Sequence, residues 1–92
     1  MPDGGEPPAD AYGQAVRCFE IICAALAEQG ASPEHVVRTR LYLSNGADWE
    51  DVGRAHAEVF GDVRPASTMV LISGFVDPSF LVEIEAYALL PE

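Results

Sequence analysis

Three segments of this chain alternate apolar and polar side chains with a period of two, and this pattern constrains the fold more than any other feature of the sequence. The segments cover residues 36–44, 65–73 and 81–90. Alternation of this kind indicates β-strands that bury one face. Because Gly74 and Asp77-Pro78 are turn signals between the second and third segments, these two strands are predicted to form a hairpin.

Two further stretches place their apolar residues at helical spacing. The first begins near Ala9 and stops at Gly30, and the second follows Asp48, a predicted N-cap, and ends at Gly61. The predicted buried stripes are Tyr12, Ala15, Val16, Phe19, Ile22, Cys23 and Leu26 in the first helix, and Trp49, Val52, His56, Val59 and Phe60 in the second. The order helix, strand, helix, strand, strand predicts an α+β fold in which two helices pack on one face of a small mixed sheet.

Length and charge bound the organisation and the partners. A chain of 92 residues is one small domain, residues 1–92 with a loop over 1–8, and it buries only about 60% of its unfolded surface, so self-association is expected. The formal net charge of −10, with only five basic side chains, argues against a nucleic-acid partner. The longest apolar run, Ile21–Ala27, is far shorter than the ~20 residues of a membrane span.

The chain start and the two cysteines point to the cytoplasm. The first eight residues lack the basic and apolar regions of a signal peptide. Cys18 and Cys23 lie five residues apart in one predicted helix, about 140° apart around its axis, so they diverge too far to form a disulfide. We expect both to be free thiols that serve as small core residues. Ile21 lies outside the buried stripe, either as a solitary exposed residue or as part of a contact that this chain alone does not complete.

The alternation predicts a sheet with one face under the helices and one face bare. The residues predicted under the helices are Val37, Thr39, Leu41, Leu43, Val70, Ile72, Val82, Ile84 and Ala86. Those predicted outward are Arg38, Arg40, Tyr42, Ser67, Met69, Leu71, Leu81, Glu83, Glu85 and Tyr87. The outward set is too apolar for a solvated surface and too charged for a core, which favours packing against another subunit. An arginine of this set is expected near the two glutamates, since a buried unpaired carboxylate is costly.

Few residues qualify as chemical groups of a site. No metal-ligand cluster, nucleotide loop or serine–histidine–aspartate arrangement is evident, so no metal and no cofactor are predicted. His35 is interpreted as an exposed or capping residue, and Trp49 as a core residue. His56 is interpreted as a core or interface histidine with one hydrogen-bonded nitrogen, with catalysis as the alternative. The glutamates either form interface ion pairs or include a proton-transfer carboxylate.

Several segments together closely resemble the RidA family, also called YjgF or L-PSP. The segments are Gln14, His35–Thr39, Asp48 with Val52 and Phe60, Arg64-Pro65-Ala66, and Val82-Glu83-Ile84-Glu85-Ala86. The resemblance extends from about residue 5 to residue 89 and implies a chorismate-mutase-like fold, a homotrimer, and ligand clefts between subunits. It also implies N-terminal strands that precede the first helix in the family. This chain lacks them, so either the start is truncated or misassigned, or a neighbour completes the sheet edge.

The resemblance also implies which residues face a ligand. Glu83 matches a glutamate thought to position water and is the predicted catalytic residue. Ser67 stands where the family's deaminases carry the arginine that grips a substrate carboxylate, Met69 stands where a cysteine is frequent, and Gly53 where asparagine is common. These three residues, with Arg40 as a replacement anion anchor, are the predicted ligand-binding set.

Three functions follow from these observations. The leading one is an oligomer, expected to be a trimer, that binds a small metabolite in clefts between subunits. The second is hydrolysis of enamines or imines with Glu83 and Ser67, and the third is a subunit for assembly or protein binding with unused clefts. The net charge of −10 argues against the endoribonuclease or translation-inhibitor roles given to some family members.

Overall fold

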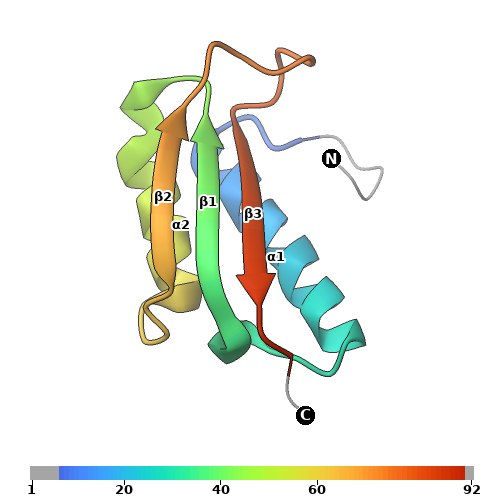
Figure 1. The fold of residues 1–92 in the computed structure, drawn as a ribbon. Helices are drawn as coiled ribbons and strands as arrows, with labels where there is room; N and C mark the ends of the chain where they lie inside the picture. Colours follow the sequence, from blue (N-terminus) through green and yellow to red (C-terminus); the bar gives the residue numbers. More distant parts are fainter. Residues whose placement is uncertain (1–6, 91–92) are drawn as a thin grey trace.

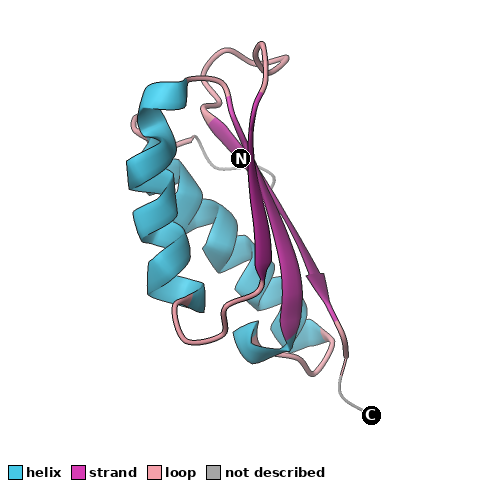
Figure 2. Cartoon of the chain, turned by 60° about the vertical axis from the view of Figure 1, so that its left-hand side comes forward, coloured by secondary structure: helices cyan, strands magenta, loops and turns pink. Residues whose placement is uncertain are grey.

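A computed structural model describes residues 7–90, so the predicted loop over residues 1–8 lies largely outside the described residues. The elements are helix α1 (Ala11–Glu28), strand β1 (Val36–Leu43), helix α2 (Trp49–Phe60), strand β2 (Ala66–Leu71) and strand β3 (Val82–Ala88), with short 3-10 turns at Pro33–His35 and Gly46–Asp48. The strands form one mixed sheet, and both helices lie on the same face of it (Figure 1, Figure 2). The predicted α+β architecture is confirmed.

The predicted hairpin between the second and third strands is wrong. The strand order is β2-β1-β3, with β1 parallel to β2 and antiparallel to β3. β1, α2 and β2 form a βαβ unit, and the segment 72–81 then crosses the end of β1 to reach its far side (Figure 1). Turn residues mark where a strand ends but not which strand the chain pairs with next, and a ten-residue connection is long enough to pass over a neighbouring strand.

Strand β1 is the centre of the molecule, and a bulge sets which of its side chains are buried. The register shifts between Val36 and Arg38, so Val36 is buried while Val37 is 45% exposed. The prediction that Val37 lies under the helices is therefore wrong, because an inserted residue changes the phase of the alternation. Beyond the bulge, Thr39 is buried as predicted. Leu41, Leu43, Val82, Phe19, Val52 and Phe60 also belong to the buried core.

In strand β2, the side chains predicted to point outward lie on the helix side of the sheet, and those predicted to lie under the helices point outward. Neighbouring residues in register share a face of a sheet, and Ser67 and Met69 are in register with Thr39 and Leu41. Ser67 and Met69, and likewise Leu71 beside Leu43, therefore lie on the helix side. Val70 lies on the open face beside Tyr42. β2 is an edge strand that is exposed along most of its length, so burial did not determine a clear alternation in its sequence.

The helices differ from their predicted stripes at particular residues. Gln14, which lies outside the predicted stripe, is buried: its Nε2 donates to the carbonyls of Pro8 and Ser79, and its Oε1 accepts from the Leu81 N–H at 2.8 Å. Leu81, predicted outward, packs against the core. Gln14 thereby ties α1 to the segment that leads into β3.

The start of α2 also departs from the prediction. Trp49, the first residue of the helix, is 58% exposed rather than buried in the core. Asp48 makes no side-chain cap. Instead Asn45 accepts from the Ala47 N–H at 3.0 Å and caps the preceding 3-10 turn.

Candidate functional site

The residues predicted to form one ligand site lie on opposite faces of the sheet. Arg40 and Glu83 lie on the open face, which the helices leave bare, whereas Ser67 and Met69 lie on the helix side at the β2 edge. Gly53 belongs to α2, which covers that second side (Figure 2). Within one chain the structure therefore brings together two groups of predicted site residues but does not join them.

The open face carries a network of arginine, tyrosine and glutamate side chains. The Tyr87 hydroxyl donates to Glu85 at 3.1 Å, and the Arg38 guanidinium lies 5.6 Å from the centre of the Tyr87 ring. Hydrogen bonds from Tyr42 and Tyr87, followed by the positive charges of Arg40 and Arg38, lower the pKa of Glu85. The prediction that an arginine lies near the glutamates is confirmed for Glu85, which pairs across the strands with Arg40.

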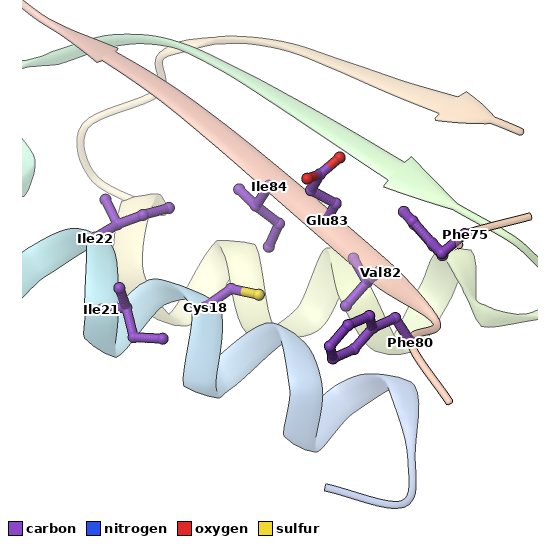
Figure 3. Close-up of a pocket in the computed structure, with 8 residues that line it drawn as sticks. All are labelled: Cys18, Ile21, Ile22, Phe75, Phe80, Val82, Glu83 and Ile84. Atoms are coloured by element: carbon purple, nitrogen blue, oxygen red, sulfur yellow. The ribbon is translucent and has the colours of Figure 1, made fainter. Parts of the chain in front are cut away.

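Glu83 lies on the same open face, beside this network. It is exposed, and its cross-strand neighbour on the open face is Tyr42. Figure 3 shows its carboxylate pointing to the side of β3 away from α1. A carboxylate in this position can orient a water molecule or a ligand proton that approaches the open face.

A second group of polar side chains links α2 to the β2 edge. The Nε2 atom of His56 lies 2.9 Å from the Thr39 hydroxyl oxygen, and Thr39 donates to the Ser67 hydroxyl at 2.9 Å. The His56 ring packs against the rings of Phe19 and Phe60, and its partial burial lowers its pKa, so the imidazole is neutral at pH 7. The interpretation of His56 as a core histidine with one hydrogen-bonded nitrogen agrees with this geometry.

Thr39 is the member of this group that was not among the predicted site residues. It was predicted as an inward-facing residue and as part of the segment His35–Thr39, with no role in a site, and the structure buries it completely. The signal that could have found it is its position as the one hydroxyl among the apolar residues of the buried face of β1, since a buried hydroxyl requires a hydrogen-bond partner.

Beyond Ser67, exposed apolar side chains line the helix side of the β2 edge. Met69 is 38% exposed and Leu71 is 64% exposed. In α2, a Cβ atom added at Gly53 would meet no heavy atom within 4 Å, so open space adjoins the helix there. An unpaired edge with exposed apolar side chains is a surface on which another chain can pack.

The other edge of the sheet borders an apolar groove between α1 and β3. Its volume is about 430 Å³, and Figure 3 shows its lining, in which Ile21 and Ile22 from α1 lie across from Ile84 and Phe80. Ile21 is half-buried, so of the two interpretations of this residue the structure favours an incomplete contact over a solitary exposed residue.

Both cysteines are free thiols, as predicted, but they line hollows rather than the core. Cys18 lies in the groove beside β3, and Cys23 lines a second hollow on α1 together with Tyr12. Burial raises the pKa of each thiol, and for Cys18 the negative charge of Glu83 adds to this effect. Both thiols are therefore protonated and weakly nucleophilic at neutral pH.

Two classes of site find no support in the described part of the chain. Between residues 7 and 90, no three histidine, cysteine, aspartate or glutamate side chains are placed to hold a metal ion together. None of the helices described there has the length and apolar character needed to cross a bilayer.

Comparison with known proteins identifies relatives along almost the whole chain. The sequence model of the family described as Endoribonuclease L-PSP matches residues 2–90. An uncharacterised protein of Streptomyces coelicolor is 44% identical over 80 residues, which are 85% of this chain and 60% of that protein. The 3-aminoacrylate deaminase RutC of Acinetobacter baylyi is 33% identical over 79 residues, which are 86% of this chain and 62% of that protein.

A solved structure shares the fold. The crystal structure of a YjgF/YER057c/UK114 family member from Mycobacterium tuberculosis superposes with a TM-score of 0.87 at 38% identity, covering 90% of this chain and 70% of that one. The chain thus spans about 60% of the length of the first of these relatives.

Proposed function

This chain belongs to the Endoribonuclease L-PSP family, the RidA family that its sequence resembles, and from this membership we propose that it assembles into a homotrimer that binds a small carboxylate-bearing metabolite in clefts between subunits. In this assembly the open face of one chain packs on the helix-side edge of β2 in the next. The proposed trimer acts in the cytoplasm and has neither nucleic acid nor membrane as a partner.

The observation that carries the proposal is the separation of two half-sites: Arg40 and Glu83 form one, and Ser67, Met69 and Gly53 form the other. Arg40 and Ser67 lie on opposite faces of the sheet, so a ligand cannot contact both within one chain. Packing between identical chains in a ring places one face of each subunit against a different face of its neighbour. A cleft at such a contact would combine Arg40 and Glu83 from one subunit with Ser67, Met69 and Gly53 from the next.

The chemistry of the two half-sites favours an anionic ligand. Arg40 supplies a permanent positive charge on the open face, and a hydrogen bond with Tyr42 is the main cause that raises its pKa further. Ser67 is exposed at the β2 edge and carries a hydroxyl able to donate to an oxygen. A guanidinium and a hydroxyl that converge on one ligand suit a carboxylate.

Sedimentation and benzoate binding test this proposal together. The wild-type protein is expected to sediment as a trimer at micromolar concentration, and benzoate is expected to raise its melting temperature. The Arg40→Gln variant is the matched control: it should still assemble but lose the benzoate effect. A stable monomer, or benzoate binding that is unaffected by Arg40→Gln, would contradict the proposal.

Hydrolysis of an enamine or imine is a second candidate, and the 33% identity to an enzyme named as a 3-aminoacrylate deaminase favours it. In this reaction Glu83 would orient the attacking water and Ser67 would hydrogen-bond the substrate. The assay couples this protein to an amino-acid oxidase that generates the imine and then follows imine loss. Loss of the imine should be faster with the wild-type protein than with Glu83→Gln, and equal rates with and without the protein would exclude this activity.

A subunit that serves only for assembly or protein binding is the third candidate. It shares the oligomer with the first two but leaves the clefts unused. Its signature would be an assembled protein whose melting temperature no small carboxylate raises.

A further inference from the structure

Three polar side chains from three different elements form a continuous hydrogen-bonded chain inside the molecule. His56 is on α2, Thr39 on β1 and Ser67 on β2, and each of the two contacts between them is 2.9 Å long. Thr39, the middle member, is fully buried, whereas Ser67 is exposed. The chain therefore has one inner end at the imidazole and one outer end at the sheet edge.

The directions of the hydrogen bonds determine what the outer end offers to a ligand. Thr39 has a single hydroxyl proton and donates it to the Ser67 oxygen. The contact between Thr39 and His56 then requires the imidazole to donate, which makes His56 the Nε2–H tautomer. Because the Ser67 oxygen already accepts from Thr39, its own proton is left to be donated outward. Successive hydrogen bonds polarise one another, so this proton is a stronger donor than that of an isolated serine.

We propose that Thr39 and His56 are positioning residues that hold the Ser67 hydroxyl as an outward hydrogen-bond donor, so that the cleft selects ligands with an acceptor oxygen, such as a carboxylate, at this point. This inference rests on the proposed function for the identity of the cleft. The hydrogen-bonded chain itself is a property of the single subunit. Ser67 contacts the ligand, while Thr39 and His56 act through it.

Experiments on the ligand-free protein test the hydrogen-bonded chain from His56 to Ser67 directly. Imidazole ¹⁵N chemical shifts should identify His56 as the Nε2–H tautomer in the wild type. In Ser67→Ala the Thr39 proton is released and can be donated to His56 instead, so the His56 signals should move toward the Nδ1–H tautomer. A histidine with a merely structural role would not respond to a change two side chains away. An Nδ1–H tautomer in the wild type, or His56 signals that Ser67→Ala leaves unmoved, would overturn the proposal.

Benzoate titration tests the consequence for binding. Thr39→Val removes the hydroxyl at nearly constant volume and should weaken benzoate binding about tenfold, as expected for loss of support to a hydrogen bond with a charged group. Thr39→Ser keeps the hydroxyl and should stay within about twofold of wild type. His56→Gln, whose amide can still donate to Thr39, should bind better than His56→Leu. Equal affinities of Thr39→Val and Thr39→Ser would overturn the proposal.

The NMR experiment and the benzoate titration together distinguish a failure of this inference from a failure of the proposed function. A wild-type trimer that binds benzoate equally well with and without the Ser67 hydroxyl overturns the role of Ser67 and leaves the assembly standing. A monomer that binds no benzoate overturns the proposed function. The imidazole signals of that monomer still decide whether the hydrogen-bonded chain exists.

Discussion

The separation of Arg40 from Ser67 predicts that two variants, each lacking one of these side chains, complement each other when they assemble together. We consider Ser67→Ala and Arg40→Gln, each of which removes one half of the proposed ligand contact. These residues lie on opposite faces of one sheet, so each cleft of the proposed trimer would take its Ser67 and its Arg40 from different chains. In a random equimolar assembly each half is intact with a probability of one half, and about a quarter of the clefts should be intact.

Calorimetric titration of co-refolded mixtures with benzoate measures this fraction as the stoichiometry of the high-affinity sites. A matched mixture combines the wild type with the double variant that carries both substitutions. If the cleft is shared between chains, both mixtures should show about a quarter of the wild-type sites. If one chain supplied both residues, the mixture of single variants would show none and the matched mixture about a half, which would refute the reasoning from the two faces.

Three further predictions concern the single subunit. Burial lowers the pKa of His56 from its usual 6.5, so the unfolded chain binds more protons than the folded chain just below that pH. The stability should therefore fall as the pH drops below about 6.5. Thermal melts from pH 8 to pH 5 should show this fall in the wild type and a smaller one in His56→Gln. Gly53→Ala should raise the unfolding free energy by about 0.5–1 kcal/mol in urea titrations, because alanine favours the middle of a helix and open space surrounds this position; a loss of stability would show that the assembly fills that space. Gln14→Met should lower the unfolding free energy by about 2–3 kcal/mol, because it leaves the Leu81 N–H and two carbonyls without partners; a neutral effect in the same titration would show that water replaces the amide.

The sequence predicted the elements well because their signals are local. The helical stripes and the alternation in β1 and β3 each depend on neighbours within a few residues, and the observed helix and strand bounds follow them closely. The pairing of strands was not predictable in the same way, since it depends on contacts between segments far apart in the chain. The bulge at Val37 also left no local mark, because both Val36 and Val37 are β-branched apolar residues suited to either face.

The candidate site was predicted as a set of residues but not as an arrangement. Ser67, Met69 and Gly53 were identified through a family resemblance, which supplies positions in the chain and no orientation. The hydrogen-bonded chain from His56 to Ser67 was beyond reach because it joins α2, β1 and β2 through the buried Thr39, and a threonine in a strand usually indicates β-propensity alone.

The wrong phase of β2 strengthens the argument for assembly. When Ser67 and Met69 were predicted on the same open face as Arg40 and Glu83, these four residues could have met within a single chain. The observed register moves Ser67 and Met69 to the helix side, so the same set of residues can meet on one ligand only across a contact between chains. In the proposed trimer, the open face with its tyrosine and arginine network and the exposed β2 edge would be the two surfaces of that contact. The proposed contact would also account for an exposed edge strand that carries Met69 and Leu71 without the charged residues that usually protect such an edge from pairing.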